Sequence, residues 1–209
     1  MIRAVVFDMD GVLIDAKDWH YEALNRALQH FGMEISRADH LTTFDGLPTR
    51  RKLEMLTVTE NLPVELHGFL NKLKQIYTLE IVSTRCRPTF AHEFALSRLK
   101  ARGLRLAVAS NSVRDTVAIM MERANLARHL DLTLSNEDVA RAKPDPEIYT
   151  TAIARLGVRP EETLIVEDNE HGIRAARASG CHLLVVRSVA DVTLSNIDRR
   201  IAEIEAQAA

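Results

Sequence analysis

Apolar and polar residues alternate in blocks along most of the chain, and these blocks predict a parallel sheet covered by helices. The first block, residues 4–7, is an uninterrupted apolar run of the kind found in strands that are buried on both faces. From about residue 90 onward, short apolar runs alternate with helical stretches, which indicates an α/β fold. Further strands are expected at residues 104–109, 132–134, 163–166 and 183–186. The pattern therefore predicts a doubly wound, Rossmann-like parallel sheet.

Capping signals mark where the helices of this region should begin and end. One helix is expected to begin near Ser112, whose hydroxyl could cap the first turn, and another at Asp145, which precedes Pro146. Glycines at positions 103, 157 and 180 are expected to end helices, because glycine adopts the left-handed conformation without strain. The alanine-rich tail after Glu203 is expected to fray.

Residues 15–89 break the alternation and read as helical throughout. Two apolar stripes at helical spacing lie in this segment, one within residues 21–31 and one within residues 66–73. We expect an α/β core formed by residues 1–14 and 90–209, with residues 15–89 inserted as a small α-helical cap domain. A module inserted directly after the first strand would lie over the carboxyl end of that strand and act as a lid.

The composition limits which binding partners and which cellular compartment are expected for the protein. The chain has 209 residues, 46% hydrophobic and 27% charged, with a formal net charge of −2, so it offers no basic surface for nucleic acid. No apolar run approaches the thickness of a bilayer, and no targeting segment is evident at the first residues, so no membrane contact is expected. Cys86 and Cys181 are too few and too far apart for a disulfide framework or a zinc cluster, which favours the cytoplasm.

Polar residues gather at four places where a predicted strand ends or the following loop begins. These are residues 8–11, 110–112, 142–145 and 167–169. In a parallel sheet such segments meet at one edge. They offer carboxylates for a cation, hydroxyl and amide donors, and one ammonium group, a set that suits a phosphoryl group in transfer.

The four segments read DMDGVL, ASNS, AKPDP and EDNEHG, and in this order they resemble the motifs of the haloacid dehalogenase-like hydrolase superfamily. The resemblance covers essentially the whole chain and points to the branch of phosphatases and phosphomutases that carry a helical cap near the N-terminus. It implies a Mg²⁺-dependent phosphoric monoester hydrolase that acts on a small phosphorylated metabolite, such as a sugar phosphate.

The resemblance also assigns roles to residues. It makes Asp8 the nucleophile that forms an aspartyl-phosphate, with Lys143 supplying positive charge against the phosphate. Mg²⁺ would be bound by the Asp8 carboxylate, the Asp10 backbone carbonyl and the Asp168 carboxylate, which are oxygen ligands of the kind this ion prefers. Glu167 is expected beside the metal site rather than on the ion. The Asp10 side chain would protonate the leaving oxygen and then activate water.

Substrate binding is expected from both domains. Ser110 and Asn111 would hold phosphoryl oxygens near a helix N-terminus. In the cap, His20, Arg50 and Lys74 are candidate substrate contacts. Taken singly, each of these residues has an ordinary structural explanation as a helix cap, a loop lysine or a solvated charge.

Three functions remain open at this point. A phosphatase is favoured, because the beta-phosphoglucomutase-like subgroup usually has an arginine three residues after the cap glycine and this chain has Thr49 there, counted from Gly46. A hexose-phosphate phosphomutase is the alternative, motivated by the spacing from Asp8 through Asp15 to His20. A phospho-ligand binding module without turnover is the third. Asp10 argues against dehalogenation and against phosphonate cleavage. The protein is expected to be a monomer or a weak homo-oligomer.

Overall fold

The computed structural model describes residues 1–207 and has at its centre a five-stranded parallel sheet with strand order β3-β2-β1-β4-β5. Every neighbouring pair of strands is parallel. The predicted α/β fold with a doubly wound parallel sheet is confirmed. The last strand begins one residue earlier than expected and ends at Val185. The strands are β1 (Ala4–Phe7), β2 (Arg105–Ala109), β3 (Leu132–Leu134), β4 (Thr163–Glu167) and β5 (His182–Val185).

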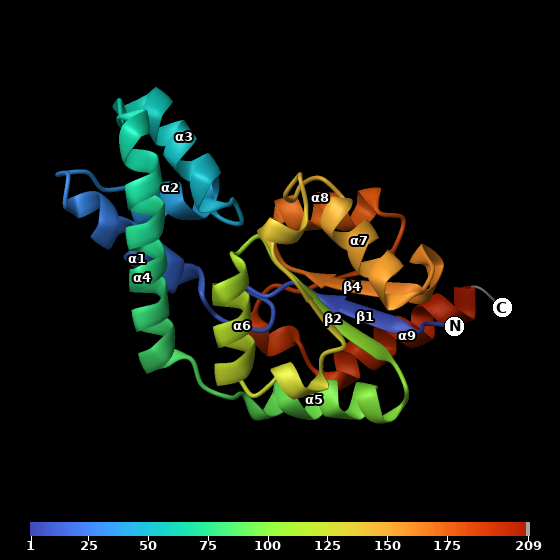
Figure 1. Ribbon diagram of the computed structural model, residues 1–209. Coiled ribbons are helices and arrows are strands. Elements are labelled where there is room, and N and C mark those ends of the chain that lie inside the picture. Colours follow the sequence, from blue (N-terminus) through green and yellow to red (C-terminus); the bar gives the residue numbers. More distant parts are fainter. Residues whose placement is uncertain (208–209) are drawn as a thin grey trace.

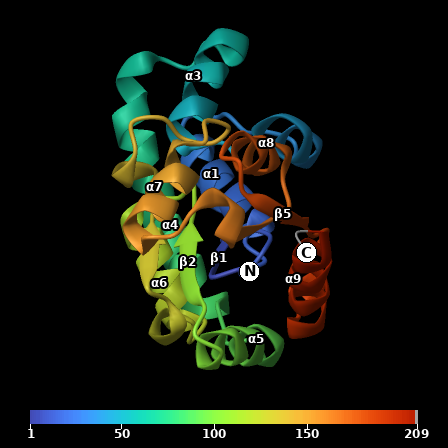
Figure 2. The same ribbon diagram turned by 90° about the vertical axis from the view of Figure 1, so that its right-hand side faces the viewer.

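Helices cover both faces of this sheet (Figures 1 and 2). Helices α5 (Phe90–Ala101), α6 (Arg114–Arg123) and α9 (Leu194–Gln207) pack on one face, and helices α7 (Glu147–Leu156) and α8 (Glu170–Ala178) pack on the other. Short 3₁₀ turns complete the connections, at Ala127–His129, Asn136–Asp138, Pro160–Glu162 and Val189–Asp191.

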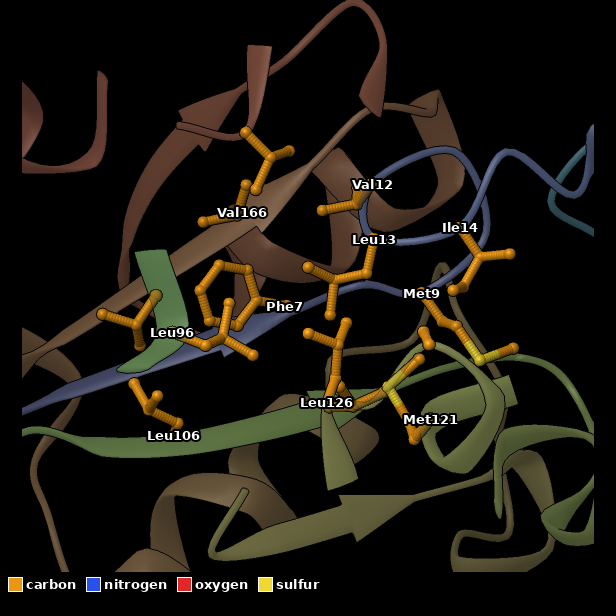
Figure 3. Close-up of a cluster of buried hydrophobic side chains, with 14 of the residues drawn as sticks. Phe7, Met9, Val12, Leu13, Ile14, Leu96, Leu106, Met121, Leu126 and Val166 are labelled. Atoms are coloured by element: carbon orange, nitrogen blue, oxygen red, sulfur yellow. The ribbon is translucent and has the colours of Figure 1, made fainter. Parts of the chain in front are cut away.

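The larger of the two cores formed on the sheet contains Phe7 and Met9, both fully buried (Figure 3). Figure 3 also shows Leu13 and Ile14 of the tight loop after β1 turning into the same cluster. Side chains alternate between the faces of a strand, so Asp8, which lies between Phe7 and Met9, faces away from this cluster. Burial of alternate side chains holds β1 in the sheet, and Asp8, directly after the strand, is free to take part in a site.

Residues 17–85 form the helices that were expected in the cap. They are α1 (Lys17–Gln29), α2 (Arg37–Asp39), a π-helical turn (His40–Phe44), α3 (Thr49–Glu60), a 3₁₀ turn (Val64–Leu66) and α4 (His67–Arg85). They enclose a hydrophobic cluster of their own, with Leu24, Leu28, Leu53 and Leu70 almost completely buried. Figure 1 shows α1, α3 and α4 beyond one end of the sheet. This is the end at which β1 finishes, and it lies opposite the N-terminus.

Two local predictions are wrong. Ser112 does not cap a helix: α6 begins at Arg114 after Val113, and the Arg114 backbone N–H donates to Glu137 Oε2 at 2.7 Å instead. The tail does not fray after Glu203, because α9 continues to Gln207, Ile204 is buried, and Glu205 Oε1 accepts a hydrogen bond from the Ile2 backbone N–H at 2.9 Å. Residues 208 and 209 of that predicted tail lie outside the described residues.

Among the helices of residues 1–207, none combines the length and the apolar character that crossing a bilayer requires. Cys86 and Cys181 are both free thiols.

Candidate active site

The site begins where β1 ends, with Asp8 almost fully buried at 4% exposure. The Asp8 backbone N–H donates to the Val166 carbonyl at 2.9 Å, so the nucleophile candidate is held as a continuation of the sheet. The chain then turns back sharply at Gly11, which has φ of 92°. A Cβ atom at Gly11 would lie 2.2 Å from Asp168 Oδ2, so this loop can approach Asp168 only with glycine at that position.

A buried lysine joins two carboxylates from different strands. Lys143 Nζ donates to Asp8 Oδ1 at 2.6 Å and to Glu167 Oε1 at 2.7 Å. All three residues are at most 4% exposed. Burial and the neighbouring Glu167 carboxylate raise the pKa of Asp8 well above its usual range, although Lys143 partly offsets them. Burial also opposes the charge on Lys143, but Asp8 and Glu167 outweigh it and raise the pKa of the lysine. Because this group contains two carboxyl groups and one ammonium group, its charge can be balanced by a further cation.

Glu167 accepts hydrogen bonds through both carboxylate oxygens and so positions the residues around it. Its Oε1 also accepts from the buried Tyr149 hydroxyl at 2.7 Å, and its Oε2 accepts from the Asp168 backbone N–H at 2.9 Å. Gly172 makes this arrangement possible, because a Cβ atom there would lie 1.6 Å from Glu167 Oε1. Both carboxylate oxygens of Glu167 therefore already accept hydrogen bonds from neighbouring residues of the site.

Asp168 completes an acidic cluster with Asp8 and Glu167, in which one carboxylate oxygen from each lies within 4.8 Å of the others. A cation from the start of the cap reaches into this cluster: Lys17 Nζ lies 2.8 Å from Asp168 Oδ2 and 3.4 Å from Asp45 Oδ2. Lys17 thus links a core carboxylate to a carboxylate of the cap. Neither Lys17 nor Asp45 was predicted for the site.

Asp10 lies at the start of a chain of polar contacts that runs into the cap. Its Oδ1 is 3.0 Å from His20 Nε2, and its Oδ2 accepts from the Ser112 hydroxyl at 2.8 Å. Beyond it, His20 Nδ1 lies 3.1 Å from Lys74 Nζ. A neutral imidazole with its proton on Nε2 satisfies both contacts, donating to Asp10 and accepting from Lys74.

The ionisation of these groups follows from their burial and from one another. Burial opposes the charge on Asp10, but His20 and the Ser112 hydroxyl outweigh it and lower the pKa of Asp10. Burial, followed by the nearby Lys74, lowers the pKa of His20. Burial, followed by repulsion from Lys52, lowers the pKa of Lys74 to about 7. Asp10 is thus held as a carboxylate whose protonation is coupled to the cap.

Ser110 and Asn111 lie at the end of β2, beside the Asp8 loop. Ser110 is 1% exposed, and its Oγ accepts from the Ser112 backbone N–H at 3.0 Å. The Asn111 amide group donates to the Gly46 carbonyl of the cap at 2.9 Å, and its carbonyl oxygen accepts from the Lys143 backbone N–H at 3.0 Å. Asn111 therefore positions both the Lys143 loop and the cap.

The candidate side chains surround one cavity of about 520 Å³ between the core loops and the cap. Asp8, Asp10, Ser110, Asn111, Lys143, His20, Lys74 and Arg50 all line it. Asp168 lies behind it, in the acidic cluster with Asp8. Arg50 differs from the rest, because its side chain is 87% exposed and pairs with Glu54 at 3.1 Å. Lys52 was not predicted for the site, and Ser112 was expected there only as part of residues 110–112, without a role of its own; both line the same cavity.

The sequence profile of the haloacid dehalogenase-like hydrolases matches residues 5–186, which include all four motifs and the cap. The chain belongs to this family. The family predicted from the motifs is therefore confirmed.

Named relatives of the family fall among phosphatases. A phosphorylated carbohydrates phosphatase of Thermotoga maritima is 29% identical over 192 residues, covering 91% of this chain and 88% of the relative. A phosphoglycolate phosphatase of Salmonella choleraesuis is 29% identical over 201 residues, covering 86% of this chain and 79% of the relative. In structure, the chain is similar to a beta-phosphoglucomutase of Clostridium difficile, with a TM-score of 0.86, 20% identity and coverage of 99% and 100%. That likeness supports the haloacid dehalogenase-like fold.

Proposed function

We propose that the protein is a phosphatase that hydrolyses a small phosphomonoester through an aspartyl-phosphate on Asp8. The observation that carries this proposal is the buried contact of 2.6 Å between Asp8 and Lys143 at the edge of a cavity that also holds Asp10. A carboxylate can attack an anionic phosphate only where nearby positive charge offsets their repulsion, and Lys143 provides it. The phosphatase names of the two relatives support the same class of reaction.

The acidic cluster fits a divalent cation. Its donors are hard carboxylate oxygens, which Mg²⁺ prefers. Glu167 Oε1 already accepts from the Tyr149 hydroxyl and Oε2 from the Asp168 backbone N–H, whereas the side-chain oxygens of Asp8 and Asp168 accept no hydrogen bond from the described backbone. We propose Asp8, Asp168 and the Asp10 backbone carbonyl as the protein ligands, with Glu167 supporting them. When bound, Mg²⁺ would neutralise phosphoryl oxygens and orient the phosphate toward Asp8.

The chain's own residues would then divide the two half-reactions. Asp8 attacks phosphorus while Lys143 neutralises charge on the transferring group. Asp10, two residues further on and a carboxylate in the resting site, must first take up a proton. It gives that proton to the leaving oxygen and afterwards takes one from the water that attacks phospho-Asp8, which leaves it protonated for the next cycle. Ser110 offers a hydroxyl to a phosphoryl oxygen, and His20 links the protonation of Asp10 to the cap.

The volume and walls of the cavity suit a metabolite rather than a polymer. About 520 Å³ lies within the usual range for small-molecule sites. We propose a phosphorylated sugar or a compound of similar size as substrate. The protein is proposed to work in the cytoplasm as a monomer or weak homo-oligomer.

Phosphate release tests the proposal directly. The purified protein should hydrolyse p-nitrophenyl phosphate with Mg²⁺, lose this activity with a chelator, and lose it at least a thousandfold in Asp8→Asn. Asp18→Asn is the matched control, because Asp18 is an exposed carboxylate of α1 that pairs with Arg37. An active Asp8→Asn protein would overturn the proposal.

A phosphomutase is the second candidate, favoured by the 3.0 Å contact between His20 and Asp10, which could restrain Asp10 from activating water until substrate is bound. Product analysis with hexose phosphates separates the two reactions. Free phosphate without an isomeric sugar phosphate indicates hydrolysis, and an isomer without net phosphate release indicates the mutase.

A further inference from the structure

Lys52 is a buried cation to which the proposed reaction assigns no role. It lies in the first turn of α3, is 6% exposed, and lines the cavity on the cap side. Within residues 1–207 its ammonium forms no hydrogen bond, and no carboxylate lies within 4.0 Å of it. Burying an ammonium group without a partner is costly, so such a group needs a counter-charge from elsewhere.

The acidic groups that attract Lys52, Asp45 and Asp10, are engaged with other partners. Asp45 lies 3.4 Å from Lys17 Nζ, and Asp10 is bonded to His20 and Ser112. Burial lowers the pKa of Lys52 to about 8, and the attraction of Asp45 and Asp10 only partly offsets it. The charged form of Lys52 thus lacks a sufficient counter-charge from the protein.

A second lysine strengthens the positive potential at this wall. Lys74 of α4 is also 6% exposed and lines the same cavity, and repulsion from Lys52 contributes to its lowered pKa. Two ammonium groups that repel each other in one cavity would both be stabilised by an anion placed between or beside them.

The neighbours of Lys52 on α3 show that the helix can satisfy its charges when they face solvent. Arg50 and Arg51 are 87% and 63% exposed and pair with Glu54 at 3.1 and 3.0 Å. Lys52 alone of these three basic residues turns its charge inward without an acidic partner.

We propose that Lys52, with Lys74 beside it, binds a second anionic group of the substrate, so that the preferred substrates are phosphomonoesters that carry another phosphate or a carboxylate. This inference rests on the proposed phosphatase function and names its substrate class. The transferring phosphoryl group would lie against Asp8 and Lys143, and the second anion would lie against the cap. Substrate selection would then depend on a residue that never touches the reacting atoms.

Matched substrate pairs test this. Fructose 1,6-bisphosphate is compared with fructose 6-phosphate for a second phosphate, and 3-phosphoglycerate with glycerol 3-phosphate for a carboxylate. The wild type should prefer the member with two anionic groups in at least one pair by tenfold or more in kcat/KM. Lys52→Met should reduce that preference at least tenfold, mainly through KM, and Lys52→Arg should keep most of it. The pair that responds identifies the anion.

Arg51→Met is the control, because it removes the same charge from the next residue of the same helix and should leave the preference within threefold. The inference is overturned if the wild type has no preference in either pair, if Lys52→Met lowers both members of a pair equally, or if Arg51→Met acts as strongly as Lys52→Met. Thermal unfolding checks that each variant is folded, and Lys52→Gln replaces Lys52→Met if the latter is not.

Hydrolysis of p-nitrophenyl phosphate keeps the two failures apart. If the wild type hydrolyses this ester, which has a single anionic group, in an Asp8-dependent manner while the pairs show no preference, the substrate class is wrong and the phosphatase assignment stands. If no phosphate is released from any substrate, the proposed function fails and this inference fails with it.

Discussion

Removing the charge of Lys143 should destabilise the fold in a way that depends on pH. In Lys143→Met, the carboxylates of Asp8 and Glu167 remain buried without the ammonium that lies 2.6 and 2.7 Å from them. Leaving one side of a buried ion pair uncompensated costs about 3–5 kcal/mol. We expect a loss of this size in the free energy of unfolding at pH 7.5.

Protonation should relieve part of this loss at lower pH. Without Lys143, nothing offsets the burial and the Glu167 charge that raise the pKa of Asp8, so the folded variant takes up one more proton on Asp8 than the wild type does. A carboxyl group whose pKa is raised in the folded state stabilises the fold below its unfolded pKa, and this contribution is lost as pH rises through the folded pKa. Each pH unit in which the extra proton is bound is worth about 1.4 kcal/mol. The deficit should therefore be about 2 kcal/mol smaller at pH 5.5 than at pH 7.5.

Urea denaturation of both proteins at the two pH values measures this. Lys100→Met is the control, because Lys100 forms a half-exposed pair with Asp131 and its loss should cost at most about 1 kcal/mol at either pH. A deficit below 1 kcal/mol for Lys143→Met, or a deficit that is the same at both pH values, would refute the reasoning.

Three further predictions concern the loop after β1, the acidic cluster and the cap. Gly11→Ala should destabilise the protein by about 2 kcal/mol more than Gly32→Ala in thermal or urea unfolding, since both glycines have positive φ but only the new methyl at position 11 would meet Asp168, at 2.2 Å; equal losses would contradict the close approach. Lys17→Met should tighten Mg²⁺ binding about tenfold in calorimetric titration, because an ammonium 2.8 Å from Asp168 Oδ2 no longer competes for that oxygen; unchanged or weaker binding would contradict it. Lys74 has a pKa lowered to about 7, so the unfolded chain binds more protons than the folded protein between about pH 7 and 10, and the stability of the wild type relative to Lys74→Met should rise by up to about 1.4 kcal/mol per pH unit over that range. Lys72→Met, which changes an exposed lysine of the same helix, is the control and should show no such slope in the same urea titrations. A stability difference between wild type and Lys74→Met that does not change with pH would contradict the lowered pKa of Lys74.

The sheet and the four acidic and polar segments could be predicted because each depends on local sequence. Residues 4–7 form a strand buried on both faces, and such a strand has few alternatives. Parallel strands then bring their carboxyl ends to one edge whatever lies between them. This is why the sequence alone predicts that Asp8, Ser110 and Lys143 lie together.

The missed residues depend on contacts that form only in the folded chain. Lys17 reads as an ordinary solvated lysine at a helix start, and only the folded cap brings it to Asp168. Ser112 reads as a helix cap, but in the structure its hydroxyl donates to Asp10 at 2.8 Å. Lys52 sits in a run of basic residues, and its burial depends on which face of α3 packs against α4. By contrast, the spacing of Ile197, Ile201 and Ile204 is a helical stripe and could have predicted the ordered end of α9.

The most direct test of the central claim is a trapped phosphoenzyme. The wild type is mixed with Mg²⁺ and a phosphomonoester it hydrolyses, quenched in acid within the first turnover, and digested for mass spectrometry. We predict one phosphoryl group on the peptide that contains Asp8, located on Asp8 itself, and none on that peptide in Asp8→Asn. Phosphate found on another residue, or rapid turnover with no phosphoenzyme in the burst phase and continued hydrolysis by Asp8→Asn, would contradict the account.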